Sequence, residues 1–142
     1  MKISARTRYA IRILVELGTD MSRVHSLREV EAGQQISAKF AKQILQPLES
    51  RSLITSRRGA RGGYRLKIDP NQVSLLDVFK ITGEPLLTAP CVNDLEYCPR
   101  NHGCGARSHW QALDKLIRDY LEQTTIADLI RAEKRDSVVP DS

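Results

Sequence analysis

The sequence predicts a mainly α-helical protein that contains one small β-hairpin. Apolar residues recur every three or four positions in several segments, which is the spacing of an amphipathic helix. A glycine-rich stretch at residues 59–63 separates two short segments that read as strands, as in a hairpin. At 142 residues, the chain can form one compact domain with an appended element.

Two helices are predicted near the start of the chain. The first covers residues 4–17 and is expected to end at Gly18, because glycine is a common residue at helix C-termini. Its apolar stripe consists of Tyr9, Ala10, Ile13, Leu14 and Leu17. Ser26 is the expected N-cap of the second helix, with Glu29 as its capping-box partner and Gly33 as its end.

A third helix is predicted to follow Ser37, its expected N-cap. The residues expected on its buried stripe are Phe40, Ala41, Ile44, Leu45 and Leu48. The long polar side chains on the opposite face are Lys39, Lys42, Gln43 and Gln46. Such donors and acceptors can contact base edges or phosphates. Two helices joined by a short glycine-containing turn resemble a helix-turn-helix. Ser37 is expected to contact DNA together with the polar residues of the third helix.

The hairpin adds a wing to this helix-turn-helix. Residues 53–58 and 64–68 are its predicted strands, and Arg57, Arg58 and Arg61 surround the tip. Glycines allow the backbone of the tip to approach a phosphate or enter a minor groove. A phosphate-cradling nucleotide loop is the rival interpretation, but it needs a Lys-Ser/Thr pair and a following helix. Residues 1–70 therefore predict a winged-helix DNA-binding region.

The basic charge is concentrated in that region. Residues 1–70 contain 14 Lys and Arg against 6 Asp and Glu, whereas residues 71–142 contain 8 against 11. The front half thus carries a net charge of +8 and the remainder −3. This asymmetry favours a polyanionic partner for the front half, although a solvated basic face would look the same. No apolar run is long enough to span a membrane, so no membrane partner is expected.

Residues 71–105 are expected to form a connecting helix, capped by Ser74 and ended by Gly83, followed by a cysteine-bearing loop. Residues 106–132 are expected to form a long helix and a short closing helix, and residues 133–142 a disordered tail. In the long helix an apolar seam steps by 3, 4 and 3 through Trp110, Leu113, Ile117 and Tyr120. The seam predicts a dimerisation helix, or else a helix that lies on its own domain.

The loop contains all the cysteines of the chain, Cys91, Cys98 and Cys104. Three cysteines leave one without a disulfide partner, and arginines stand where a secretory signal would be apolar, so we expect a cytoplasmic protein. An iron–sulfur cluster is favoured, because it needs several thiolates on an irregular loop. Zinc is an alternative, with His102 or His109 as its fourth ligand. Redox-active thiols and inert buried cysteines also remain open.

Four segments together resemble a known family: ISARTRYAIRIL, ISAKFAKQILQPLESRSLI, SRRGARGGYRL and the three-cysteine loop followed by a tryptophan helix. They are similar to the IscR-like and NsrR-like bacterial iron–sulfur regulators of the Rrf-two family, over roughly residues 1–132. The resemblance implies a homodimeric winged-helix transcription regulator, dimerised through the long helix. It also implies a cluster ligated by Cys91, Cys98 and Cys104 that controls promoters.

Two positions depart from the family pattern. IscR-like members can use a histidine three residues after the last cysteine as the fourth ligand, and Arg107 stands there. Some NsrR-like members use an N-terminal carboxylate of the partner subunit, and Arg8 stands at the matching place. The candidate fourth ligand is therefore His109, with His102 as the alternative. A carboxylate from elsewhere and a small exogenous ligand also remain open. The segments GEPLLTAP and TTIADLI resemble the nitric-oxide-sensing branch, which favours a 4Fe–4S over a 2Fe–2S cluster.

The sequence thus predicts a non-enzymatic transcription regulator, expected to be a repressor of DNA operators. Its expected signals are nitric oxide, redox stress and iron or cluster status. One alternative is a cluster-free or zinc-bearing regulator that uses its thiols directly. Another, from a different class, is an iron–sulfur electron carrier or assembly partner, which would not need a basic winged helix.

Overall fold

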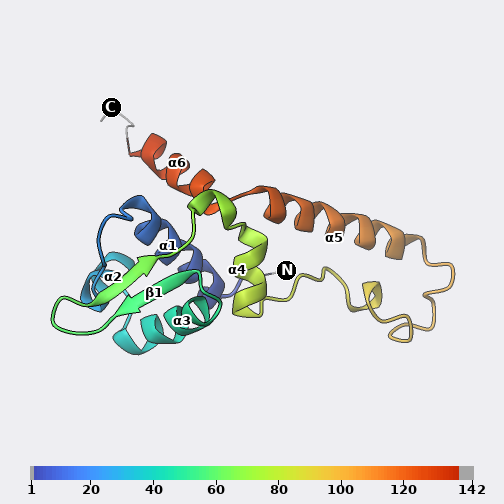
Figure 1. The fold of residues 1–142 in the computed structure, drawn as a ribbon. Coiled ribbons are helices and arrows are strands. Elements are labelled where there is room, and N and C mark those ends of the chain that lie inside the picture. Colours follow the sequence, from blue (N-terminus) through green and yellow to red (C-terminus); the bar gives the residue numbers. More distant parts are fainter. Residues whose placement is uncertain (1, 138–142) are drawn as a thin grey trace.

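A computed structural model of the protein describes residues 2–137 (Figure 1). Its α-helices are α1 (Ala5–Thr19), α2 (Leu27–Gln34), α3 (Ala38–Ser50), α4 (Leu75–Thr82), α5 (Gly105–Gln123) and α6 (Ile126–Asp136). Strands β1 (Ile54–Arg57) and β2 (Gly63–Leu66) form an antiparallel pair, and short 3-10 turns lie at Pro70–Gln72 and Pro90–Val92. The prediction of a mainly helical fold with one small hairpin is confirmed.

The main core lies among α1, α3 and the hairpin. Its largest fully buried side chains include Ile13, Leu14, Leu17, Ile44, Leu45, Leu48 and Ile54. The apolar stripe predicted for α3 is confirmed, with Phe40 half-buried and packed against Tyr9. Hence the α3 face that carries the long polar side chains is left on the surface.

The N-caps predicted for three helices are confirmed. Ser26 and Ser74 each form a capping box, with Glu29 and Asp77 respectively, and the Ser37 hydroxyl accepts from the Phe40 amide at 3.1 Å. Gly83 ends α4 in the left-handed conformation at φ 73°, also as predicted. Each of these signals is local, which is why the sequence reveals it.

Gly18 and Gly33, predicted as helix ends, lie inside their helices, so both predictions are wrong. A Cβ at Gly18 would lie 2.8 Å from Cδ1 of Ile130, because α6 packs closely on α1 there. A Cβ at Gly33 would lie 2.8 Å from Oε1 of Glu16, and α2 ends instead at Gln35 in the left-handed conformation. These glycines serve close packing rather than chain reversal.

The wing is fixed to the segment before α2. His25 and Tyr64 exchange backbone hydrogen bonds, with N–O distances of 2.8 and 2.7 Å. The adjacent Gly63 has φ +156°, and a Cβ there would lie 2.1 Å from the carbonyl oxygen of His25. Only glycine permits this approach, so the position of the wing beside the helix-turn-helix depends on it.

Helix α5 joins this unit through a second apolar cluster, formed by Leu76, Phe79, Leu86 and Leu121. Helix α6 packs into the main core through Ile126 and Ile130. Helix α5 begins at Gly105, one residue before the predicted start at 106, with Cys104 as its N-cap. Helix α6 continues to Asp136, so residues 133–136 are helical rather than part of a disordered tail. Ser137 is the C-cap of α6, and residues 138–142 of that predicted tail lie outside the described residues.

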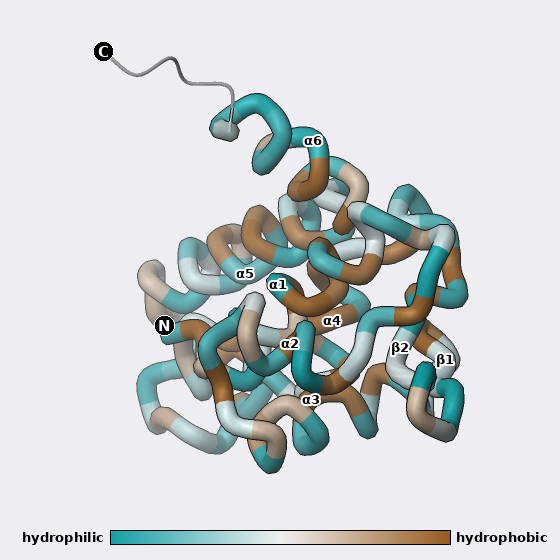
Figure 2. Tube along the Cα trace, turned by 90° about the vertical axis from the view of Figure 1, so that its left-hand side faces the viewer, coloured by the Kyte–Doolittle hydropathy of each residue, from teal (hydrophilic) through white to brown (hydrophobic). Residues whose placement is uncertain are grey.

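Hydropathy differs between the two C-terminal helices. Figure 2 shows apolar and polar stretches alternating along α5, whereas α6 becomes hydrophilic towards its C-terminal end.

Over residues 2–137, no helix combines the length and apolar character needed to cross a membrane.

The two glycines Gly63 and Gly105 provide a matched test of the wing contact. Gly63→Ala would force a Cβ into the His25 carbonyl and should destabilise the fold by about 3 kcal/mol or more. Gly105→Ala meets no atom within 4 Å and should change stability by less than about 1 kcal/mol. Urea unfolding followed by circular dichroism measures both. Equal stability of the two variants would contradict the proposed role of Gly63.

Candidate DNA interface and cysteine loop

The polar face of α3 is a continuous exposed surface. All the residues predicted for it are exposed, namely Ser37, Lys39, Lys42, Gln43 and Gln46. The Ser37 hydroxyl oxygen accepts from the Phe40 amide, and its own hydrogen therefore stays available for an external acceptor. The first turn of α3 is thus capped and ready to present these side chains together.

The wing arginines are exposed as well. Arg57 ends β1, Arg58 follows it, and Arg61 lies at the tip, where the Gly62 amide donates to the Gly59 carbonyl at 2.9 Å. Figure 1 shows the wing and α3 on the side of the molecule away from α6. The structure therefore places both groups of predicted DNA-binding residues in one winged-helix unit.

A cleft of about 570 Å³ separates the wing from the start of α2. Arg57 and Arg58 line it from the wing, and Arg28 lines it from α2. Arg28 was not predicted from the sequence, although its place two residues after the Ser26 cap could have revealed it.

Side-chain contacts also join the wing to α3. The Ser56 hydroxyl donates to Glu49 of α3 at 2.5 Å. Burial, and then the charge of Glu49, raise the pKa of the neighbouring Tyr64 hydroxyl. Tyr64 therefore stays neutral in the basic surroundings of the wing.

All three cysteines are free thiols. Cys91 and Cys98 are half-buried, and Cys104 is exposed at the N-terminus of α5. Within residues 2–137, no three His, Cys, Asp or Glu side chains lie in an arrangement that could hold a metal ion. The structure thus places the three thiols on one loop but does not bring them to one point.

The two candidate histidines occupy different surroundings. His102 lines a pocket of about 550 Å³ together with Cys98 and Cys104. His109 is exposed on the second turn of α5 and is not among the residues that line this pocket. The geometry therefore brings His102, rather than His109, close to two of the thiols.

Two side chains of α5 form hydrogen bonds with the backbone of residues 88–92, the segment that leads into the cysteine loop. The Arg107 guanidinium donates to the carbonyl oxygens of Cys91 at 3.0 Å and Val92 at 3.3 Å. Asp114, only 5% exposed, accepts from the Thr88 amide at 2.8 Å. Asp114 was missed, although it lies seven residues before the buried Leu121 and hence on the inner side of α5.

The seam predicted on α5 divides into two parts. Ile117 packs against the second apolar cluster of its own chain. Trp110, Leu113 and Tyr120 are 42%, 40% and 67% exposed, and Leu116 between them is 67% exposed. Helix α5 therefore carries an outer apolar stripe of Leu113, Leu116 and Tyr120 beside the face that its own domain covers.

Comparison with known proteins identifies the family of this chain. The family Rrf2, described as an iron-dependent transcriptional regulator, matches residues 3–132. Protein rrf2 of Nitratidesulfovibrio vulgaris is 30% identical over 132 residues, which cover 92% of this chain and 88% of that protein.

Solved structures agree in fold. The structure of CymR, titled the global cysteine regulator of Bacillus subtilis, aligns with TM-score 0.79 and 26% identity over 93% of this chain and 98% of that chain. An IscR structure from T. potens aligns with TM-score 0.76 over 100% of this chain and 94% of that one, and at 22% identity it supports the fold alone. The chain belongs to the Rrf2 family and is a DNA-binding transcriptional regulator, not an enzyme.

Proposed function

We propose that this protein is a homodimeric repressor whose operator affinity is controlled by an iron–sulfur cluster held by Cys91, Cys98 and Cys104. The observation that carries the proposal is the position of the three free thiols. They lie on the loop that joins α4 to α5, and Cys104 is the N-cap of α5. A change at the loop therefore acts directly on the start of α5.

The donor set fits such a cluster in chemistry. Thiolates are the usual ligands of iron–sulfur clusters, and the N-terminus of α5 favours negative charge beside Cys104. The loop has to draw its thiols together to bind one cluster, since they do not converge in the structure. When bound, the cluster would supply a group that nitric oxide, oxidants or iron shortage can modify. His102 and His109 are the candidates for a fourth ligand.

Binding of DNA is assigned to the winged helix. Helix α3 presents lysines and glutamines that can contact base edges in a major groove, and the wing arginines can contact phosphates or a minor groove. The net charge of +8 over residues 1–70 supports this division. The family match favours this function over an electron carrier or assembly partner.

Dimerisation is assigned to the outer apolar stripe of α5. Leu116 and Tyr120 are two-thirds exposed, and large apolar side chains gathered on one stripe favour burial against a second copy. A two-fold dimer places two recognition helices on one operator. Because Arg107 and Asp114 tie the loop to the same helix, loop rearrangement and dimer geometry are coupled in this proposal.

A second candidate is a regulator that uses its thiols without a cluster, or binds zinc. The exposure of Cys104 favours direct thiol chemistry. So does the similarity to CymR, whose structure is titled that of a cysteine regulator. Analysis of the iron, zinc and sulfide bound to the purified protein separates these possibilities.

The wing arginines should govern the salt dependence of DNA binding. For Arg57→Ala, the slope of log K against log salt should flatten by about 0.9 for each phosphate that the variant no longer neutralises, or about 1.8 in a dimer with two equivalent wings. Arg131→Ala, on α6 and paired with Asp128, is the matched control and should keep the slope. Fluorescence anisotropy with a promoter fragment measures both. An unchanged slope for Arg57→Ala would remove Arg57 from the interface.

The outer stripe should hold the dimer. Leu113→Glu would place an unpaired charge in a buried contact, which costs several kcal/mol, and should yield monomers at micromolar concentration. Gln111→Glu introduces the same charge on the opposite, exposed face of α5 and should leave the dimer intact. Sedimentation velocity distinguishes the two species. A dimeric Leu113→Glu protein would assign the interface elsewhere.

The cysteines should be needed for the cluster and not for the fold. Cys91→Ala, Cys98→Ala and Cys104→Ala should each keep the helical circular dichroism but lose visible absorption, iron and sulfide from protein purified without oxygen. Val92→Ala, beside Cys91, is the control and should keep them.

The metal content of the unmodified protein decides among the candidate cofactors. About four iron atoms per chain would support a 4Fe–4S cluster, and about two a 2Fe–2S cluster. Zinc without sulfide would instead support the zinc-bearing regulator. The spectra of His102→Ala and His109→Ala, compared side by side, identify which histidine is a ligand, if either is.

A further inference from the structure

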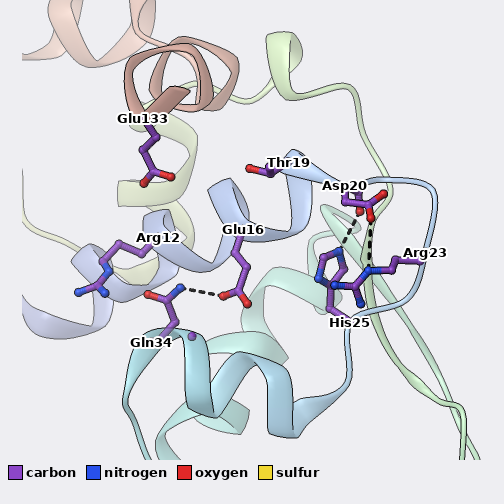
Figure 3. Close-up of a pocket in the computed structure, with 9 residues that line it drawn as sticks. Arg12, Glu16, Thr19, Asp20, Arg23, His25, Gln34 and Glu133 are labelled. Atoms are coloured by element: carbon purple, nitrogen blue, oxygen red, sulfur yellow. Dashed lines mark hydrogen bonds and ion pairs between the residues drawn. The ribbon is translucent and has the colours of Figure 1, made fainter. Parts of the chain in front are cut away.

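A pocket of about 460 Å³ lies between α1, α2 and α6 (Figure 3). Its lining is mainly charged and polar, and includes Arg12, Glu16, Asp20, Arg23, Gln34 and Glu133. Pockets of this size commonly hold small ligands. No residue of the DNA interface or of the cysteine loop contributes to it, so neither function accounts for it.

Gln34 is the group in this pocket whose hydrogen bonding is incomplete. Its side chain is 7% exposed, and Nε2 donates to Oε2 of Glu16 at 2.7 Å. That bond fixes the orientation of the amide, since the reversed amide would set two acceptors against each other. Oε1 is then buried without a partner. A buried acceptor of this kind costs stability unless a donor reaches it.

Glu16 is held in place by the shape of α2. A Cβ at position 33 would lie 2.8 Å from Oε1 of Glu16 and 3.1 Å from Oε2, so Gly33 leaves the space that this carboxylate occupies. In Figure 3 the carboxylate of Glu16 lies beside the amide of Gln34, with Glu133 of α6 opposite both. Three acceptor groups therefore line the pocket, Glu16 and Gln34 on one side and Glu133 across from them.

The remaining charges fall into two groups. Arg23 is already paired with Asp20 at 3.3 Å and with Glu29 at 2.8 Å. The hydrogen bond from Arg23 lowers the pKa of Glu29, and hydrogen bonds from Ser22 lower the pKa of Asp20, so both acids stay ionised. The Arg23 guanidinium is therefore engaged within the protein and is not available to a ligand.

Arg12, Glu16 and Glu133, in contrast, form no ion pair within residues 2–137. The Arg12 guanidinium lies over the Tyr9 ring, 5.1 Å from its centre. One cation and two anions are thus left facing the same pocket as the unpartnered oxygen of Gln34.

We propose that this pocket binds a small zwitterion, a free α-amino acid, with its ammonium group at Glu16 and Gln34 and its carboxylate at Arg12. An ammonium group has three donors and no acceptor, which matches the oxygen of Gln34 together with the carboxylates of Glu16 and Glu133. A guanidinium binds a carboxylate through two parallel hydrogen bonds. Neither a simple amine nor a simple carboxylate satisfies both sides.

The test is calorimetric titration of the full-length protein, purified without oxygen, with each of the twenty standard amino acids in turn. At least one should bind with a measurable Kd. Its methyl ester, which lacks the carboxylate, and its N-acetyl derivative, which lacks the ammonium, should each bind at least about tenfold more weakly. Binding by none of the twenty, or equal binding of either derivative, would overturn the proposal. These probes act on the unaltered protein and do not depend on the folding of any variant.

Variants then locate the site. Glu16→Gln and Arg12→Gln each remove one charge while keeping a polar side chain at the pocket, and each should raise Kd at least about tenfold. Glu122→Gln, on the exposed surface of α5, is the matched control and should leave Kd unchanged. Cys91→Ala should also bind normally, which separates this site from the cluster. Unchanged affinity in both Glu16→Gln and Arg12→Gln would place the bound amino acid elsewhere and overturn the proposal.

Discussion

A short backbone bridge between Ser74 and Thr125 sets how the C-terminal helices sit on the winged helix. The Leu75 amide donates to the Thr124 carbonyl and the Ile126 amide donates to the Val73 carbonyl, both at 2.9 Å. The bridge lies at the turn between α5 and α6, just before α4 starts. It therefore fixes one end of α5 and the start of α6 together. The second apolar cluster and the close contact of α6 with Gly18 both depend on this arrangement.

From this fixed end, α5 packs against the core on one side and is exposed to solvent on the other. Its inner side, with Ile117 and Leu121, completes the core formed with α4, while the outer stripe stays exposed. Arg107, near its far end, binds the Cys91 carbonyl, and Asp114, near its middle, binds the Thr88 amide before the cysteine loop. A single helix thus connects the core, the surface proposed for dimerisation and the segment proposed for sensing. The pocket proposed to bind an amino acid shares no lining residue with any of these three regions.

Local sequence signals predicted much of this structure, and long-range contacts account for what they missed. The caps at Ser26, Ser37 and Ser74 depend on residues three positions away, so the sequence reveals them. Gly18 and Gly33 were misread as helix ends, because glycine also occurs where another element packs closely. The spacing of three cysteines indicates a ligand set but contains no information on how a loop folds around a cluster.

The length of α5 has a mechanical consequence. At 19 residues it extends about 28 Å, and Figure 1 shows it projecting from the body with the cysteine loop at its outer end. The helix can then behave as a lever arm with its pivot at the Ser74–Thr125 bridge. A tilt of about 10° at the pivot moves the outer end by about 5 Å for an arm of that length. In the opposite direction, a displacement of several ångströms at the loop is reduced to a small rotation at the winged helix, so the loop can rearrange substantially without disrupting the core.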